Sequence, residues 1–173
     1  PDRLAPDRPG GVLSPADGVV LSIGPAAPPP ELGLAADGFT RICVFLSVFD
    51  VHVTRAPATG LVLNAVHRPG KYLVASREKA SDDNERLSVA IETPAGIVAF
   101  ALIAGLIARR IVSPLAAGQR LVAGERSGLI RFGSRSDIFV PRTVPVLVAK
   151  GERVWAGETV LADLSPLLST PGR

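Results

Sequence analysis

The 173-residue sequence is poor in the residues that carry most familiar chemistries, with one cysteine, two histidines and no methionine. The single cysteine, Cys43, excludes an internal disulfide and a multi-cysteine metal site, and its apolar neighbours predict a buried strand residue. Any imidazole-dependent step must use His52 or His67. The longest near-continuous apolar run, Ile97 to Ile107, is shorter than the roughly 20 residues that a membrane-spanning helix needs.

Common catalytic motifs are absent as well. The sequence has no Gly-x-Ser-x-Gly of the serine hydrolases, no His-Glu-x-x-His, no phosphate loop of the Walker type and no clear dinucleotide motif. We therefore expect no metal site. The net charge is +3, but no dense basic run occurs, so nucleic acid is not an expected partner. The basic residues are mostly arginine, which suits an anionic membrane surface or a phosphorylated small molecule.

The composition predicts one domain, residues 1–173, of the mainly β class. Glycine (17) and proline (16) are frequent, and valine, isoleucine and leucine dominate the apolar residues, which favours short strands and turns. The polar segment 76–86 reads as a loop, and Gly105 should break or bulge the last predicted strand. The predicted strands are 19–23, 41–48, 61–66, 87–93 and 97–112.

A weak internal repeat supports this fold class. Gly118-Gln-Arg-Leu-Val-Ala-Gly-Glu125 resembles Gly151-Glu-Arg-Val-Trp-Ala-Gly-Glu158, and each unit gives a turn, a short apolar strand and a second turn. Two such units fit the paired halves of a small β-sandwich or barrel-like domain with few short helices, related to the biotinyl- and lipoyl-type sandwiches.

Ser134 is the candidate nucleophile, although a Gly-Ser step between two strands is also a common turn. Gly133 leaves its carbonyl open to close approach, and a serine beside it can attack if a base and an acid stand nearby. On a strand, Asp50 and His52 would share one face, as a structural pair or as a carboxylate that orients an imidazole. Asp17, in a turn before Gly18, completes the three residue types that activate a serine hydroxyl.

Five segments, taken together and in order, carry a resemblance to a known family. They are Ser14-Pro-Ala-Asp-Gly18, Phe49-Asp-Val-His-Val-Thr-Arg-Ala-Pro-Ala-Thr-Gly60, Arg68-Pro-Gly70, Asn84-Glu-Arg86 and Arg131-Phe-Gly-Ser-Arg135. The sequence resembles phosphatidylserine decarboxylase in its short bacterial and archaeal form, from about residue 9 to residue 164. Longer members carry a second histidine where this chain has Arg55, and Leu102 stands where a polar residue, often glutamine, is expected.

The resemblance implies a self-processing proenzyme. Ser134 would attack the Gly133 carbonyl, and β-elimination would release a β chain, 1–133, and an α chain, 134–173, that begins with a pyruvoyl group made from Ser134. That covalent group, with no metal and no pyridoxal phosphate, would form a Schiff base with phosphatidylserine and yield phosphatidylethanolamine and CO2. His52 would reprotonate the carbanion, Asp17 and Asp50 would assist, and Arg55 and His67 would contact substrate.

The resemblance also implies partners and a location. We expect an anionic membrane surface as partner, a homodimer as one option, and the cytoplasmic face of the bacterial cell membrane as the site of action. The chain opens at Pro1 and not at methionine, so a preceding membrane anchor stays open. Three alternatives also stay open: a pyruvoyl decarboxylase of another amino-acid-like substrate, an inactive member that never cleaves, and a non-catalytic lipoyl-like module. A lipid substrate predicts an exposed apolar patch rimmed by arginine beside Ser134.

Overall fold

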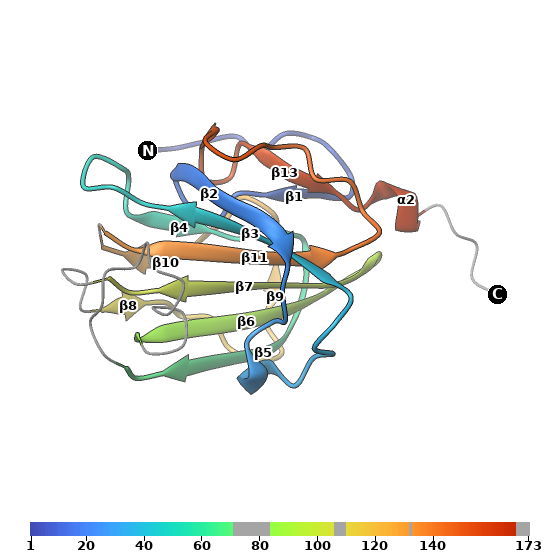
Figure 1. Ribbon diagram of the computed structural model, residues 1–173, viewed down its shortest axis with the longest axis horizontal. Helices are drawn as coiled ribbons and strands as arrows, with labels where there is room; N and C mark the ends of the chain where they lie inside the picture. The colour runs from blue at the N-terminus through green and yellow to red at the C-terminus, as the bar shows by residue number, and fades with distance from the viewer. Residues whose placement is uncertain (71–83, 106–109, 132, 169–173) are drawn as a thin grey trace.

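The computed structural model describes residues 1–70, 84–105, 110–131 and 133–168, and the regular secondary structure in these ranges consists almost entirely of antiparallel strands (Figure 1). The strands are β1 (Gly11–Leu13), β2 (Gly18–Pro25), β3 (Phe39–Phe45), β4 (Val53–Arg55), β5 (Gly60–Arg68), β6 (Arg86–Thr93), β7 (Gly96–Ile103), β8 (Ile111–Val112), β9 (Arg120–Leu121), β10 (Arg126–Ile130), β11 (Arg135–Pro141), β12 (Arg153–Val154) and β13 (Val160–Asp163). A 3-10 turn, η1 (Pro30–Leu32), and a one-turn helix, α2 (Ser165–Leu168), complete the described elements. Within these ranges no helix is long and apolar enough to cross a membrane. The prediction of a mainly β chain is confirmed.

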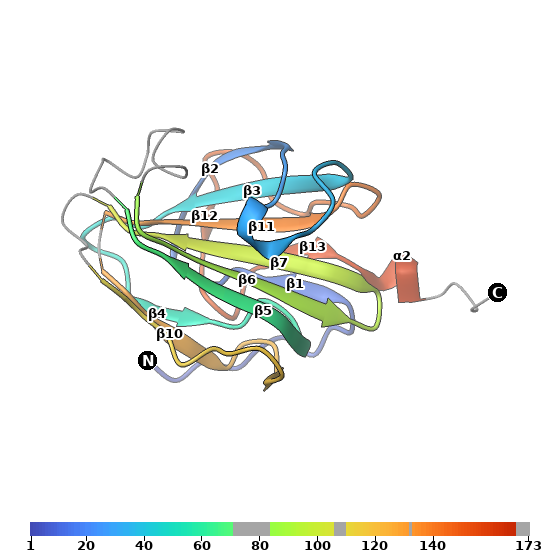
Figure 2. The ribbon, with the colours of Figure 1, turned by 90° about the horizontal axis from the view of Figure 1, so that it is seen from below.

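One eight-stranded sheet, in the order β12-β2-β3-β11-β7-β6-β5-β9, curls into a half-barrel. Two small sheets, β4-β10-β8 and β1-β13, lie across its concave side, as Figure 2 shows from below. Alternate residues of the large sheet point into the space between, because side chains alternate across a strand. Phe100, Ile42 and Ile138 from the large sheet pack there with Ile130 and Leu161 from the small ones. The core therefore lies between two β layers, as in a sandwich.

The opposite face of the large sheet is partly covered by the connection between β2 and β3. Leu32 of η1 packs on small residues of β6 and β7, among them Ala90 and Ala99. Glu31 of the same turn binds Arg86, with Nε to Oε1 at 2.7 Å, and accepts a hydrogen bond from Ser88 at 2.9 Å. These contacts hold a charged pair in a mostly buried setting.

The internal repeat found in the sequence is real in three dimensions. Its two short strands, β9 and β12, form the two opposite edges of the large sheet. The two turns also make equivalent bonds: the Gly118 N–H donates to the Val62 carbonyl, and the Gly151 N–H donates to the Val20 carbonyl, both at 2.8 Å. The strands they bond to, β5 and β2, follow a second pair of similar segments, Ala56-Pro-Ala-Thr-Gly60 and Ser14-Pro-Ala-Asp-Gly18.

This second repeat, which the sequence analysis missed, places two glycines in equivalent positions. A Cβ on Gly18 would meet the carbonyl oxygen of Phe45 at 2.1 Å, and a Cβ on Gly60 would meet that of Glu92 at 2.2 Å. Each glycine therefore allows its strand to approach the neighbouring strand closely. The fold consists of two similar halves, and Asp17 in one half corresponds to Thr59 in the other.

Most predicted strands are confirmed, with different ends. Strand β3 ends at Phe45, three residues before the predicted end, and the residues from Leu46 to His52 form a turn and an extended loop. The predicted strand from Ile97 to Val112 is divided into β7 and β8, and residues 106–109 lie outside the described ranges. Of the predicted polar loop, residues 76–83 are likewise outside them.

Candidate active site

Ser134 lies buried at the junction between β10 and β11, next to the end of β3. The backbone of Leu46 holds this junction from both sides: its carbonyl accepts from the Gly133 N–H at 3.0 Å, and its N–H donates to the Ser134 carbonyl at 2.9 Å. The Ser134 hydroxyl donates to the Arg131 carbonyl. The two residues joined by the Gly133–Ser134 peptide bond are thus each hydrogen-bonded to Leu46 through the backbone group that flanks this bond.

Gly133 has a left-handed backbone, with φ of +74°. A Cβ built on this residue would have no heavy atom within 4 Å, so glycine is favoured here by backbone conformation and not by crowding. Residues with side chains rarely adopt this region. The glycine therefore turns the chain into β11 and leaves open space beside the carbonyl that follows it.

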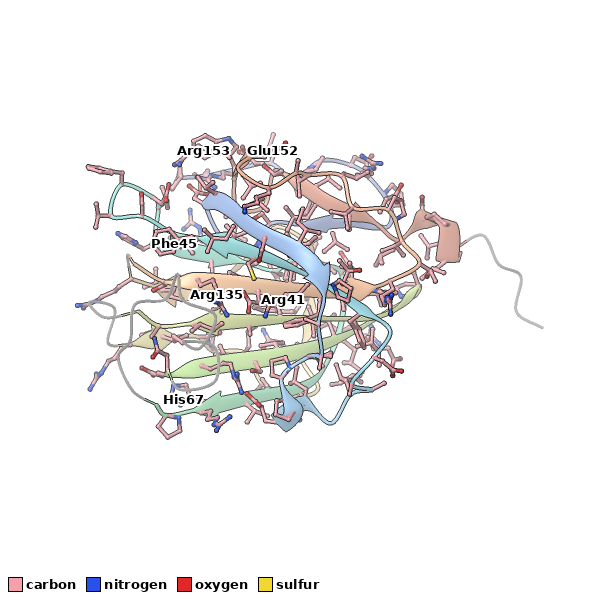
Figure 3. The ribbon with its side chains drawn as sticks, viewed as in Figure 1. Arg41, Phe45, His67, Arg135, Glu152 and Arg153 are labelled. Carbon is pink, nitrogen blue, oxygen red and sulfur yellow. The ribbon has the colours of Figure 1, made fainter. Side chains whose placement is uncertain are left out.

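Arg135 fixes the chain immediately after Ser134. Its guanidinium is fully buried and pairs with Asp137 on the same face of β11, with Nε to Oδ1 at 2.9 Å and Nη2 to Oδ2 at 3.0 Å. Strand β11 lies between β3 and β7 and is paired with both (Figure 3 labels Arg135 on it). The segment that begins at residue 134 is therefore anchored independently of the residues before it.

His52 lies in the same corner, in the connection between β3 and β4. Its carbonyl accepts from the Ile130 N–H at 2.9 Å, one residue before the Arg131 carbonyl that binds the Ser134 hydroxyl. His52 also lines a cavity of about 380 Å³ with mainly apolar walls. Two exposed arginines stand at this cavity; its lining among the described residues is His52, Arg110, Val112, Leu129, Ile130 and Arg131.

Asp50 does not share a strand with His52, which corrects that part of the sequence prediction. Asp50 closes a turn: its Oδ2 accepts from the Ser47 N–H at 2.7 Å, a local side-chain bond typical of aspartate. Its other oxygen pairs with Arg153, whose guanidinium lies over the ring of Trp155 at 4.8 Å from the centroid. The carboxylate of Asp50 thus shapes the loop that carries His52.

Asp17 is 1% exposed, and its carboxylate accepts hydrogen bonds from one side chain and one backbone N–H. Arg3 Nη1 and Nη2 donate to its two oxygens at 2.5 and 2.8 Å, and the Ala156 N–H donates at 2.7 Å. Burial alone would raise the pKa of Asp17, but these hydrogen bonds outweigh it and hold the pKa below its usual value. Asp17 remains a charged carboxylate at neutral pH.

The structure brings Asp17 to the strand beside the Ser134 junction, although the hydrogen-bond partners described for Asp17 and Ser134 are different residues. Gly18, the next residue, packs against the end of β3, and β3 in turn pairs with β11. Leu46, which holds Ser134, follows directly on that end of β3. Asp17, His52 and Ser134 therefore come from three segments that meet at one end of the large sheet.

The two residues predicted to contact substrate lie elsewhere. Arg55 is buried and donates to two backbone carbonyls, those of Gly124 at 2.8 Å and Pro1 at 2.7 Å. His67 Nε2 lies 2.6 Å from Glu85 Oε1; His67 is on β5, which is next to the β9 edge of the sheet, whereas Arg153 lies on β12 at the opposite edge (both labelled in Figure 3). Neither lines the cavity beside His52, and their role in substrate binding stays a prediction.

Sequence reasoning missed several residues of this corner. Arg3 lies 14 positions from Asp17, and Leu46 acts only through its backbone, so no spacing motif could reveal either. Arg110 and Arg131 had a usable signal, because each is a charged residue at the end of an apolar strand segment. Among the described residues, no group of three histidine, cysteine, aspartate or glutamate side chains is placed to hold a metal ion.

Comparison with known proteins identifies the family to which this fold and corner belong. A family model described as phosphatidylserine decarboxylase matches residues 1–162. A phosphatidylserine decarboxylase proenzyme from Paramagnetospirillum magneticum is 54% identical over 165 residues, which cover 95% of this chain and 69% of that protein. Those from Granulibacter bethesdensis and Cereibacter sphaeroides are each 52% identical, covering 96% and 95% of this chain and 68% and 72% of theirs. The chain belongs to the phosphatidylserine decarboxylase family, and the resemblance found in its motifs is confirmed.

Proposed function

We propose that this chain cleaves itself between Gly133 and Ser134 and then decarboxylates phosphatidylserine to phosphatidylethanolamine. The observation that carries the proposal is the Gly133–Ser134 step at the start of the central strand β11, where Ser134 is buried and Leu46 bonds to the backbone on both sides. Relatives named as proenzymes support a processed precursor. The products of cleavage are a β chain, 1–133, and an α chain, 134–173.

Cleavage uses the backbone that the structure fixes. The Ser134 hydroxyl leaves the Arg131 carbonyl, its oxygen bonds to the Gly133 carbonyl carbon, and the Gly133–Ser134 C–N bond breaks as the nitrogen takes a proton. Loss of the Cα proton of residue 134 then expels the Gly133 carboxylate and leaves a dehydroalanine. Water replaces its nitrogen, ammonia departs, and residue 134 becomes a pyruvoyl group.

His52 is the proposed base for this attack, because it lies beside the Ile130–Arg131 backbone on which the serine hydroxyl rests. Asp17 supplies a fixed carboxylate in the same corner, held by Arg3 and the Ala156 N–H, and is the proposed acidic partner in this step. The repeat supports a role for Asp17 beyond holding its turn. The Ala123 N–H donates to the Thr59 hydroxyl at 3.0 Å as the Ala156 N–H donates to Asp17, so a hydroxyl suffices to hold that turn.

The residues around Ser134 fit a pyruvoyl group at that position. The open space beside Gly133 gives the released end room to move, while the ion pair between Arg135 and Asp137 keeps residue 134 in place. When formed, the group supplies an electrophilic carbonyl and an electron sink for decarboxylation. His52 is placed to return a proton to the substrate carbon, because an imidazole exchanges protons near neutral pH. Arg110 and Arg131 would bind the lipid phosphate at the cavity.

The test measures CO2 release from phosphatidylserine labelled in its carboxyl group. We expect release by the wild-type protein, loss after treatment with a carbonyl reagent such as hydroxylamine, and no release by Ser134→Ala. Ser136→Ala is the matched control, because it removes a second buried hydroxyl from the adjoining strand and leaves the cleavage site intact. Release from free serine in place of the lipid would support the alternative amino-acid substrate and overturn the lipid assignment.

The proposal also places the protein at the cytoplasmic face of the bacterial cell membrane, where the lipid substrate is found. The cavity beside His52 supports a lipid substrate, since its walls are mainly apolar and two arginines stand beside them. Association into a homodimer stays a prediction.

A further inference from the structure

At its tip, the loop that carries His52 has two apolar side chains that stand largely exposed. Phe49 is 93% exposed and Val48 is 53% exposed. The loop projects beyond the ends of the strands at the left of Figure 1. A single exposed apolar residue is ordinary, but an almost fully exposed phenylalanine at the tip of a loop needs a partner to offset its contact with water.

More exposed apolar side chains lie at the same end of the molecule. Leu129 on β10 is 51% exposed and pairs with Val112 on β8, which is 57% exposed, and both line the cavity beside His52. Leu129 also pairs with Val53, the first residue after the loop that carries Phe49. The loop tip and the cavity therefore form one apolar rim, which we define as Val48, Phe49, Val112 and Leu129.

Cationic and amphipathic side chains surround this rim. Arg110 and Arg131 are exposed at the cavity. On the other side of the loop, Arg153 pairs with Asp50 and stacks on Trp155, which is 44% exposed. Tryptophan and arginine are suited to the boundary between lipid headgroups and acyl chains, because each has an apolar body and a polar end.

We infer that the apolar rim docks on an anionic phospholipid bilayer, with Phe49 inserted among the headgroups and Arg110 and Arg131 on lipid phosphates. Apolar tips flanked by cations bind bilayers through the sum of apolar burial and attraction to anionic lipid. The cavity opens at the rim, so a lipid headgroup reaches His52 while its acyl chains stay in the bilayer. This inference rests on the proposed function for the identity of that lipid; the docking itself does not require turnover.

The experiment measures sedimentation of the full chain with vesicles that contain no phosphatidylserine. We expect binding to vesicles of equal parts phosphatidylcholine and phosphatidylglycerol, and much weaker binding to phosphatidylcholine alone. Phe49→Ser should weaken partitioning about tenfold. Arg110→Gln and Arg131→Gln should each weaken it about fivefold, and only on the anionic vesicles.

Val122→Ser is the matched control, because Val122 is a 62% exposed apolar side chain away from the rim. Its neighbour Ala123 lines a pocket with the β6–β7 turn, at the other end of the strands. It should bind as the wild type does. Equal binding by the Phe49 and Val122 variants would overturn the inference. So would a loss of self-association in Phe49→Ser with vesicle binding unchanged, since the rim would then join two copies of this chain.

A second measurement does not depend on lost binding. Cys43 is buried, so a Phe49→Cys variant can be labelled at the loop tip with an environment-sensitive dye. Its emission should shift to the blue on anionic vesicles; an unchanged spectrum in the bound protein would contradict insertion.

Activity gives a third test. Phe49→Ser should lose turnover of phosphatidylserine in vesicles and keep turnover of a dispersed short-chain phosphatidylserine. If the wild type released CO2 from neither form, the proposed function would fail while the vesicle result still stood.

Discussion

Removal of the Arg3 side chain should destabilise the fold strongly at neutral pH. Arg3 is 10% exposed, and its guanidinium makes three hydrogen bonds, two to the buried Asp17 carboxylate and one to the Ala156 carbonyl at 2.9 Å. Without Arg3, the carboxylate keeps the Ala156 N–H and loses the guanidinium that bonds to both of its oxygens. A buried charge left in this way is costly, because its own desolvation is no longer compensated.

The expected size of this effect follows from the burial of Asp17. Breaking a buried pair by removal of one partner costs about 3 kcal/mol or more. For a chain of 173 residues this corresponds to a fall in Tm of roughly 6–12 °C. The Arg3→Lys variant should recover part of the loss, since lysine restores the charge without the two-pronged contact.

The effect must also depend on pH in a definite direction. The pKa of Asp17 is lower in the folded chain than in the unfolded chain, so its stabilising contribution is complete above the unfolded value. It is lost as the pH falls through the folded value. The gap in stability between wild type and Arg3→Ala should therefore be widest at pH 6–8 and shrink in acid, toward and below the ordinary aspartate pKa of about 3.9.

The assay is urea or thermal unfolding followed by circular dichroism across this pH range. Arg8→Ala is the control, because Arg8 lies on the same terminal arm and its pair with Asp163 is solvent-exposed, with the Arg8 side chain 46% exposed. That variant should unfold close to wild type. If Arg3→Ala also unfolded within about 0.5 kcal/mol of wild type at pH 7, the structural role given to the Arg3–Asp17 pair would be refuted.

Three further predictions concern single side chains. Gly18→Ala should lower the free energy of unfolding in urea by about 3 kcal/mol or more, because the new Cβ would lie 2.1 Å from a backbone oxygen. Gly24→Ala, on the same strand, places its Cβ with no atom within 4 Å and should change stability little. Similar losses in the two variants would contradict the close approach at Gly18. Burial and the nearby Asp137 carboxylate raise the pKa of Cys43 to about 11. Alkylation of this thiol in the folded protein at pH 8 should therefore be at least about 100-fold slower than that of free cysteine, and a fast reaction would refute its burial. Asp17→Thr should still fold, because threonine holds the equivalent turn of the repeat, but with reduced stability because Arg3 loses its carboxylate. It should cleave itself at a strongly reduced rate, and cleavage at the wild-type rate on gels would remove Asp17 from the mechanism.

The sequence allowed the fold class to be predicted because its signals are local. Glycine and proline mark the turns, and β-branched and aliphatic runs mark strands such as β2, β5 and β6. The repeat around Gly118 and Gly151 was visible because the turns keep their glycines. The matching repeat around Gly18 and Gly60 was missed because the residue before each glycine differs in chemistry, although both accept the same kind of backbone hydrogen bond.

The candidate site was only partly predictable, since much of it depends on contacts between distant segments. The motifs selected Asp17, His52 and Ser134 as candidates, and their roles stay predictions. Alternation along a strand gave the wrong setting for Asp50, whose carboxylate instead closes a turn. The partner of Asp17 comes from the terminal arm, where composition predicts nothing specific. Contacts through backbone atoms, such as those of Leu46, leave no trace in side-chain chemistry.

The central claim is the break between Gly133 and Ser134, and intact mass measured under denaturing conditions tests it most directly. The account predicts two species for the wild-type protein, 1–133 with an ordinary carboxyl terminus and the 40-residue segment 134–173 with a pyruvoyl group in place of its amino-terminal serine. It predicts one uncleaved species for Ser134→Ala and two for Ser136→Ala. A single intact wild-type chain that persists on long incubation, or a Ser134→Ala protein that still breaks at this bond, would contradict it.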